Sequence, residues 1–78
     1  MQYVYILNCA DGKTYTGCTD NLIKRIERHN SGYVPATKER RPVTLISYVG
    51  FSDKYKAFAF EQYLKTGSGR AFMKKRLI

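Results

Sequence analysis

The chain has few of the features that mark secreted, membrane or zinc-stabilised proteins. Among its 78 residues only Cys9 and Cys18 are cysteines, which is too few for a disulfide scaffold and lacks metal-site spacing. No apolar run approaches the roughly 20 residues needed to cross a membrane. The opening segment, 1–8, has no basic residue ahead of its short apolar run, so it is typical of a strand and not of a signal peptide. We therefore expect a cytoplasmic protein that has no membrane partner.

Several catalytic patterns are missing as well. The glycines of Gly67-Ser68-Gly69 follow a predicted helix and not a strand, which argues against a phosphate-binding glycine loop. No serine, histidine and aspartate stand at a spacing that would suggest a hydrolase triad. Asp20 and Asp53 precede predicted helices and look like caps, so no second acid near Glu61 suggests a two-metal site.

The length of the chain limits its architecture. A domain of 78 residues buries only about 60% of the surface that its unfolded form exposes. This size argues against a two-domain enzyme and against a large enclosed cavity. Hydrophobic residues make up 44% of the chain, which is enough for a folded core. We expect a single domain over residues 1–78.

Positive charge dominates the sequence. Lys and Arg number 14 against 6 Asp and Glu, so the formal net charge is +8. The basic residues gather in three stretches that a small domain must bring close together. Such a surface favours a polyanion as partner, and nucleic acid is the commonest one. The side chains that we expect to bind nucleic acid are Lys24, Arg28, Lys38, Arg40, Arg41, Lys65, Arg70 and Lys74.

Residue types and chain breakers predict the order of the structural elements. Aromatic and β-branched segments predict strands at 3–7, 14–18 and 43–51. The third of these is strongly apolar, so we expect it to be central or covered on both faces. Capping residues predict a helix over 21–30 after Thr19 or Asp20, a helix to about 65 after Ser52 or Asp53, and a short basic helix to 76 after Ser68. The order ββαβαα implies an α/β protein of the α+β type, with a small sheet and helices packed over it.

The first two predicted strands form a hairpin around residues 9–13. This segment suits a three-residue loop in which Gly12 adopts the left-handed conformation as a bulge. Cys9 then pairs with Lys13. In this register Cys9 and Cys18 point to opposite faces of the sheet, which argues against a disulfide between them.

Two tyrosines of this hairpin are candidates for catalysis. With the three-residue loop, Tyr5 lies opposite Gly17, and Tyr5 and Tyr15 share one face as diagonal neighbours. Gly17 leaves open space beside Tyr5. Tyrosines in strands are more often packing residues, so both interpretations stay open from spacing alone.

The predicted helix 21–30 brings a histidine and an arginine together. Leu22, Ile23 and Ile26 form one apolar arc of this helix. Arg25 and His29 are four residues apart and lie on one border of the arc, at the rim of the core. A substrate groove would lie at this rim, although such a pair is also common on plain surfaces.

A carboxylate stands on the apolar face of the second helix. This face consists of Ala57, Phe58, Phe60 and Leu64. Glu61 projects into the middle of the same face, where burial costs several kcal/mol unless the charge is paired or binds a metal. An ion pair with Arg25 and a hard cation bound with water and phosphate oxygens are the two explanations.

Taken in order, these residues resemble a known enzyme family. Tyr3-Val4-Tyr5 and, further along the chain, Tyr15-Thr16-Gly17 resemble the paired motif that names the GIY-YIG nuclease superfamily. Arg25, His29 and Glu61 continue the match, which covers nearly the whole chain. The short length resembles the single-domain bacterial branch, which is related to the nuclease domain of the excision-repair excinuclease and to homing endonucleases. Each letter pair is unspecific alone, whereas the full ordered set is a strong signal.

The resemblance implies a fold and a reaction. The fold is a three-stranded antiparallel sheet flanked by helices, and the reaction is hydrolysis of DNA phosphodiester bonds with one divalent metal, Mg²⁺ or Mn²⁺. By this resemblance Glu61 holds the metal and Arg25 contacts the phosphate. Tyr5, helped by His29 or by the field of the metal, deprotonates the attacking water, and Tyr15 positions water or phosphate.

The resemblance also bears on the substrate. Relatives usually borrow a separate domain to grip DNA, so we expect another protein or domain to supply substrate specificity. The expected role is in DNA repair, on structured or damaged DNA and with little sequence preference. The chain departs from the family pattern at Tyr3, which replaces a glycine, at Thr16, which replaces an isoleucine, and at Cys18, where many relatives carry a lysine.

Two alternatives to an enzyme follow from the same residues. The first is a non-catalytic nucleic-acid-binding module that keeps the scaffold and its basic surface. The second is a protein-interaction domain in which Tyr33, Tyr48 and Phe51 contact a partner. In that domain Glu61→Ala would cost about 3–5 kcal/mol, because Arg25 would lose its buried partner.

Overall fold

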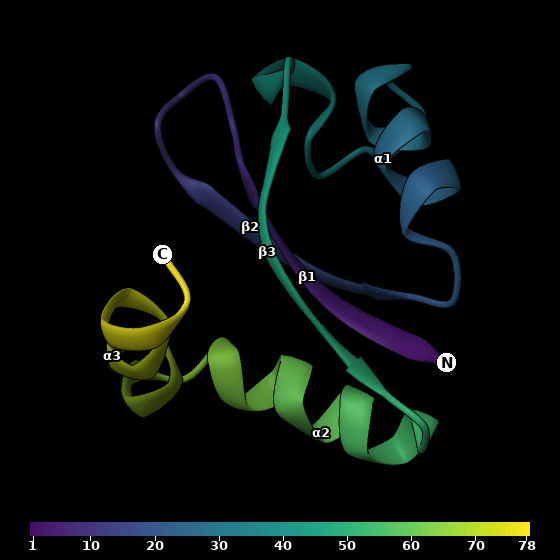
Figure 1. Cartoon of the computed structure of the whole chain (residues 1–78). Coiled ribbons are helices and arrows are strands. Elements are labelled where there is room, and N and C mark those ends of the chain that lie inside the picture. The colour runs from purple at the N-terminus through teal and green to yellow at the C-terminus, as the bar shows by residue number, and fades with distance from the viewer.

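The computed structural model describes all residues from 1 to 78, and its elements follow the predicted order (Figure 1). A three-stranded antiparallel sheet carries helices in the order ββαβαα, which confirms the predicted fold class. The strands are β1 (Gln2–Asn8), β2 (Thr14–Thr19) and β3 (Thr44–Phe51). The helices are α1 (Leu22–Asn30), α2 (Lys54–Leu64) and α3 (Gly67–Arg76), and a short 3-10 turn, η1 (Lys38–Arg40), precedes β3.

The central strand of the sheet is β1 and not β3. The strand order is β2-β1-β3, and the segment of β1 from Val4 to Leu7 is buried throughout. β3 is an edge strand in which exposed and half-buried residues alternate. The prediction that segment 43–51 is central or covered on both faces is therefore wrong. Ile46 and Tyr48 remain exposed. An apolar run shows that a strand favours burial, but the neighbouring strands and helices decide which of its faces are covered.

The hairpin between β1 and β2 forms as predicted. The Cys9 N–H donates to the carbonyl of Lys13 at 2.9 Å, and the Gly12 N–H donates to the carbonyl of Cys9 at 2.9 Å. Gly12 has a φ of +80°, the left-handed conformation that the bulge requires. Both cysteines are free, and Cys9 and Cys18 pack on opposite faces of the sheet.

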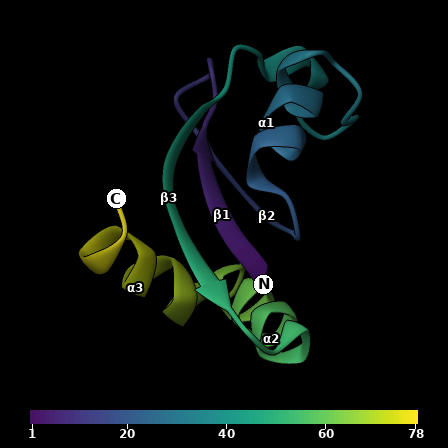
Figure 2. The same ribbon diagram turned by 45° about the vertical axis from the view of Figure 1, so that its right-hand side comes forward.

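Helices cover the two faces of the sheet and define two small cores. In Figure 1 α1 lies above the sheet and α2 with α3 lies below it, and Figure 2 keeps this separation in the turned view. The core between the sheet and helices α2 and α3 consists of Val4, Ile6, Ala57, Leu64 and Met73. The core on the α1 side consists of Tyr5, Leu7, Cys9 and Val43, with Leu22 and Ile26 packed against it. No helix of the structure is long and apolar enough to span a membrane.

The buried stripe of α1 differs from the predicted one. Leu22 and Ile26 pack on the core, but Ile23 is 74% exposed. His29 takes the third place in the stripe, since positions i, i+4 and i+7 align on one face of a helix. The helix is capped by the Asn21 side chain, which accepts from the Lys24 N–H at 3.1 Å, so the prediction of Thr19 or Asp20 as the cap is wrong.

The two C-terminal helices begin at different kinds of cap. Asp53 caps α2, as predicted, and its carboxylate accepts the N–H groups of Tyr55 and Lys56. Thr66 caps α3 by accepting the Gly69 N–H at 3.1 Å, so the prediction of Ser68 as the cap is wrong. Phe58 is 42% exposed and does not widen the buried face of α2 as predicted.

Candidate active site

A buried hydrogen bond joins the central strand to the end of α1. The Tyr5 hydroxyl lies 2.9 Å from Nε2 of His29, and the two residues are 2% and 0% exposed. Gly17 stands opposite Tyr5 in the β1–β2 register. A Cβ atom at position 17 would overlap the hydroxyl end of the Tyr5 ring and lie 3.0 Å from its Cε1. The space that the sequence predicts beside Gly17 is therefore filled by Tyr5 itself.

The other ring nitrogen of His29 meets a residue that sequence reasoning missed. Nδ1 of His29 lies 2.7 Å from the hydroxyl of Thr37, which is fully buried. Thr37 belongs to the loop after α1, where its N–H donates to the carbonyl of Val34 at 3.1 Å and its carbonyl accepts from Arg40 at 2.9 Å. The sequence around Thr37, a single threonine in a polar loop, does not indicate that it contacts His29. His29 lies buried and not at the rim because this loop closes over it.

Asn30 fixes the end of α1 against the start of β3. Its side-chain amide donates to the carbonyl of Val43 at 3.2 Å and its side-chain oxygen accepts the Val43 N–H at 2.8 Å. The two hydrogen bonds resemble those between neighbouring strands, and they join residues that are 13 apart in the sequence. It holds the turn of helix that carries His29.

Tyr15 completes an aromatic group around His29. Its ring centroid lies 5.2 Å from that of His29 and 6.5 Å from that of Tyr5. Tyr5 and Tyr15 share a face of the hairpin, as the predicted register requires. Tyr15 is half-buried, so it connects the buried pair to the surface.

The surroundings set the charge states of the buried pair. Burial raises the pKa of Tyr5 well above its ordinary value, the nearby Tyr15 and Glu61 raise it as well, and the Arg25 charge lowers it. Burial also lowers the pKa of His29, and the Arg25 charge lowers it further. At neutral pH Tyr5 is therefore a phenol and His29 a neutral imidazole.

The depressed pKa of His29 predicts a loss of stability in weak acid. The unfolded chain, in which histidine titrates near 6.5, binds more protons than the folded protein below that pH. The free energy of unfolding should therefore fall as the pH decreases from about 7.5 to about 5.5. Urea denaturation across this range measures it, and a constant or rising stability would contradict the assignment. His29 is the only histidine, so His29→Gln should flatten the curve.

Arg25 and Glu61 lie near Tyr5 without contacting each other. Arg25 is half-buried and forms neither of the two ion pairs in the structure. Glu61 pairs with Lys65, the C-cap residue of its own helix, at 3.1 Å between Nζ and Oε2. The predicted alternative of an ion pair between Glu61 and Arg25 is therefore wrong. The i,i+4 spacing within α2 offers Glu61 a closer partner.

Glu61 could hold a cation that has few protein ligands. No three His, Cys, Asp or Glu side chains cluster anywhere in the chain, as a tightly ligated metal centre would need. The side chain of Glu61 is 18% exposed, and only one of its oxygens is paired. Mg²⁺ and Mn²⁺ are commonly held by one or two carboxylates, with water and phosphate oxygens completing the shell. Glu61 therefore fits such an ion, provided that a phosphate of the substrate also coordinates it.

A basic groove, here called the α3 groove, opens beside Tyr15 between the hairpin and α3. Its volume is about 770 Å³ and its floor includes Leu64 and Met73. The basic side chains that line it are Lys13, Arg40, Lys65, Arg70 and Lys74. Four of these five are among the predicted nucleic-acid-binding residues. Lys13 was missed because hairpin position alone does not show that α3 faces it.

A second basic groove, here called the α1 groove, lies at the start of α1. Its volume is about 310 Å³, and Lys24, Arg25 and Arg28 line it. Two of the predicted binding residues, Lys38 and Arg41, line neither groove. The Arg41 side chain instead donates to the carbonyls of Lys38 at 2.8 Å and of Asn30 at 3.4 Å.

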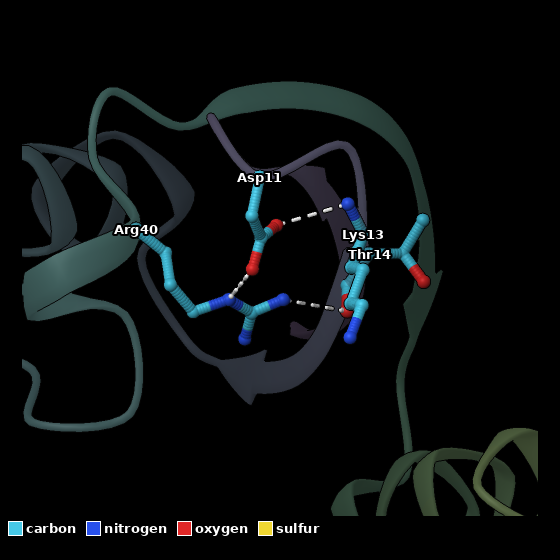
Figure 3. A network of polar contacts seen from close by, with 4 residues as sticks. All are labelled: Asp11, Lys13, Thr14 and Arg40. Atoms are coloured by element: carbon cyan, nitrogen blue, oxygen red, sulfur yellow. Dashed lines mark hydrogen bonds and ion pairs between the residues drawn. The ribbon is translucent and has the colours of Figure 1, made fainter.

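The hairpin tip is tied to the loop that carries Arg40 (Figure 3). The Arg40 guanidinium donates to Asp11 at 2.7 Å and to the Thr14 carbonyl at 3.4 Å, while Asp11 also accepts the Lys13 N–H at 2.9 Å. Hydrogen bonds from Arg40 and from the Lys13 backbone hold the pKa of Asp11 below its usual range. This contact fixes the hairpin edge of the α3 groove, and it leaves Arg40 with less free charge than its neighbours in the groove.

Comparison with known proteins agrees with the predicted resemblance. The model of the GIY-YIG catalytic domain matches residues 1–76. A UPF0213 protein of Pediococcus pentosaceus is 47% identical over 64 residues, which cover 81% of this chain and 67% of that protein. A UPF0213 protein of Staphylococcus haemolyticus is 44% identical over 73 residues, 92% of this chain and 89% of that one.

The likeness extends to three dimensions. The solution NMR structure of a UPF0213 protein from Bacillus halodurans matches with a TM-score of 0.60 at 34% identity, covering 96% of this chain and 84% of that chain. Sequence and fold thus agree over nearly all residues of the chain. The chain belongs to the GIY-YIG catalytic-domain family, among the small UPF0213 proteins.

Proposed function

We propose that the protein is a divalent-metal-dependent endonuclease that hydrolyses DNA phosphodiester bonds. The observation that carries this proposal is the buried hydrogen bond between Tyr5 and His29, with Tyr15 leading from it to a basic groove. A pure binding surface has no need for a neutral histidine hydrogen-bonded to a buried phenol. Membership of a nuclease-type family supports the same reaction class.

The basic side chains would hold the DNA backbone on both sides of this group. Lys65, Arg70 and Lys74 line the α3 groove, and Arg25 in the α1 groove offers a forked donor to a phosphate and to the charge that develops on it. Phosphate contacts carry little sequence information. We therefore expect low sequence preference, on structured or damaged DNA, with another protein or domain selecting the site. Such a role fits DNA repair in the cytoplasm.

The proton of the attacking water would leave through the buried pair. As the water oxygen bonds to phosphorus, its proton passes to the Tyr5 oxygen while the Tyr5 proton passes to Nε2 of His29. The bond between phosphorus and the 3′ oxygen breaks, and the 3′ oxygen leaves with the bonding electron pair and takes a proton from solvent. His29 keeps the proton of the attacking water until it returns that proton to solvent. This route avoids a free phenolate, which the raised pKa of Tyr5 disfavours. Tyr15 would position the water or the phosphate.

Glu61 is the residue that would hold the metal. When bound, Mg²⁺ or Mn²⁺ supplies polarisation of a phosphate oxygen and stabilisation of the leaving oxygen. Glu61 presents its carboxylate close enough for its charge to act on Tyr5. The Lys65 ammonium would release Glu61 and turn to a phosphate in the α3 groove, which it already lines.

The grooves predict which charges matter for DNA binding. In the double variant Arg70→Ala/Lys74→Ala the slope of log affinity against log salt should become shallower by about 2, because each phosphate contact accounts for about one unit. Lys54→Ala/Lys56→Ala removes the same charge from exposed positions on α2 outside both grooves. Fluorescence anisotropy with a labelled duplex measures both slopes. Equal slopes for the two double variants would show that the α3 groove does not bind DNA.

The reaction itself is tested by cleavage. Purified protein is incubated with labelled supercoiled, single-stranded and branched DNA in Mg²⁺, in Mn²⁺ or in chelator. We expect cuts that require the metal and that chelator abolishes. Binding of every DNA without any cut would favour the non-catalytic binding module instead.

A further inference from the structure

Both ring nitrogens of His29 are bound to side chains of the protein. Nε2 faces the Tyr5 hydroxyl at 2.9 Å and Nδ1 faces the Thr37 hydroxyl at 2.7 Å. His29 and Thr37 are 0% exposed, and Tyr5 is 2% exposed. No solvent contact therefore decides which nitrogen carries the proton, and the two protein partners must do so.

Counting donors and acceptors selects one arrangement. If the Thr37 hydroxyl donates to Val34, at 3.5 Å, its oxygen can accept from Nδ1–H of His29, and the bare Nε2 accepts the Tyr5 hydroxyl proton. Every proton in this series of hydrogen bonds, from Tyr5 through His29 to Thr37, then has an acceptor. In the reverse arrangement Thr37 donates to Nδ1 and Nε2–H donates to Tyr5. The phenol proton of Tyr5 is then left without an acceptor in the protein, because its hydroxyl has no other side-chain or backbone partner.

We propose that Thr37 is a positioning residue that holds His29 as the Nδ1–H tautomer, so that Nε2 is the acceptor for the Tyr5 proton. The threonine is itself held: its N–H donates to Val34 at 3.1 Å and its carbonyl accepts from Arg40 at 2.9 Å. A β-branched side chain has few χ1 rotamers, so this backbone fixes the direction of the hydroxyl. The tautomer is a property of the folded protein, and its catalytic effect rests on the proposed nuclease function.

The tautomer can be read without any activity. His29 is the only histidine of the chain, so a ¹⁵N-labelled sample gives two imidazole nitrogen signals from one ring. Long-range ¹H–¹⁵N correlation spectra at pH 7.5 should show a protonated Nδ1 and a bare Nε2. Thr37→Val keeps the shape of the side chain and removes the hydroxyl, which leaves Nδ1–H without its acceptor, so it should give a mixture of the two tautomers. Thr37→Ser restores the hydroxyl and should restore the wild-type spectrum.

Cleavage gives the second readout. Thr37→Val should lower kcat about 10- to 100-fold, as the loss of an orienting partner does elsewhere, and leave KM for DNA within about twofold, since Thr37 lines neither groove. Thr37→Ser should recover most of kcat. If cleavage fails in wild type while the tautomers follow the prediction, the nuclease proposal is wrong and the role of Thr37 stands.

The proposal is overturned by any of three results. A wild-type spectrum with Nε2–H would contradict it before any variant is made. The proposal can therefore be tested even if Thr37→Val does not fold. A folded Thr37→Val protein with the wild-type tautomer and the wild-type kcat would show that the hydroxyl only fills space. Failure of Thr37→Ser to restore the tautomer would also count against it.

Discussion

Glu61→Gln should abolish metal-dependent DNA cleavage and leave the protein almost as stable as before. The amide keeps the size of the side chain but is a poor ligand for a hard cation, so the rate should fall at least about 100-fold. The ion pair that is lost is a partly exposed one with Lys65, which is worth about 0.3–0.5 kcal/mol. Cleavage assays and thermal melts of the same preparation measure both effects.

Glu27→Gln is the matched control for Glu61→Gln. Glu27→Gln removes the same charge from an exposed position on α1 that lines neither groove, and it should leave cleavage unchanged. A fall in stability of about 3–5 kcal/mol for Glu61→Gln would instead indicate a buried structural acid. That result, with cleavage retained, would favour the protein-interaction domain. In the structure Tyr33 and Tyr48 are exposed, but Phe51 packs against Phe60.

Gly17→Ala should disrupt the site from the opposite strand. The added methyl group would overlap the hydroxyl end of the Tyr5 ring, which is buried. Overpacking of this kind costs about 1–3 kcal/mol. Moving Tyr5 also breaks its 2.9 Å hydrogen bond to His29, so cleavage should fall with stability.

The control for this variant is another glycine-to-alanine change. Gly67 begins α3 and has no atom within 4 Å of the position of an added Cβ. Gly67→Ala should therefore be neutral or stabilise by about 0.4–1 kcal/mol. Urea denaturation measures both variants, and the imidazole ¹⁵N signals of His29 report the hydrogen bond. If Gly17→Ala matched Gly67→Ala in both measurements, the close fit between Gly17 and Tyr5 would be refuted.

Local features of the sequence predicted the hairpin well. A bulge at Gly12 fixes the register of β1 against β2, and the two-residue period of a strand then places Tyr5 and Tyr15 on one face. The helix caps were less certain, because Thr19, Asp20 and Asn21 are adjacent capping residues and only backbone geometry selects Asn21.

Contacts between distant segments account for what the sequence did not predict. His29 is buried because a loop eight residues further on supplies Thr37, and helical periodicity cannot show that a loop will cover a face. The same limit applies to the basic residues. Arg41 turns back to the loop and Lys13 reaches the α3 groove, although both are simply basic residues in turns. Charge predicted a polyanion-binding surface but not which side chains form it.

The measurement that tests the central claim most directly is cleavage and binding of one labelled branched DNA by wild type and Glu61→Gln, purified side by side. We predict that wild type cuts in Mg²⁺ or Mn²⁺ and not in chelator. Glu61→Gln should bind the same DNA with an affinity within a few-fold of wild type and not cut it. Equal cutting by both proteins would indicate a contaminating nuclease, and binding by both with no cutting by either would contradict the assignment of Tyr5, His29 and Glu61 to catalysis.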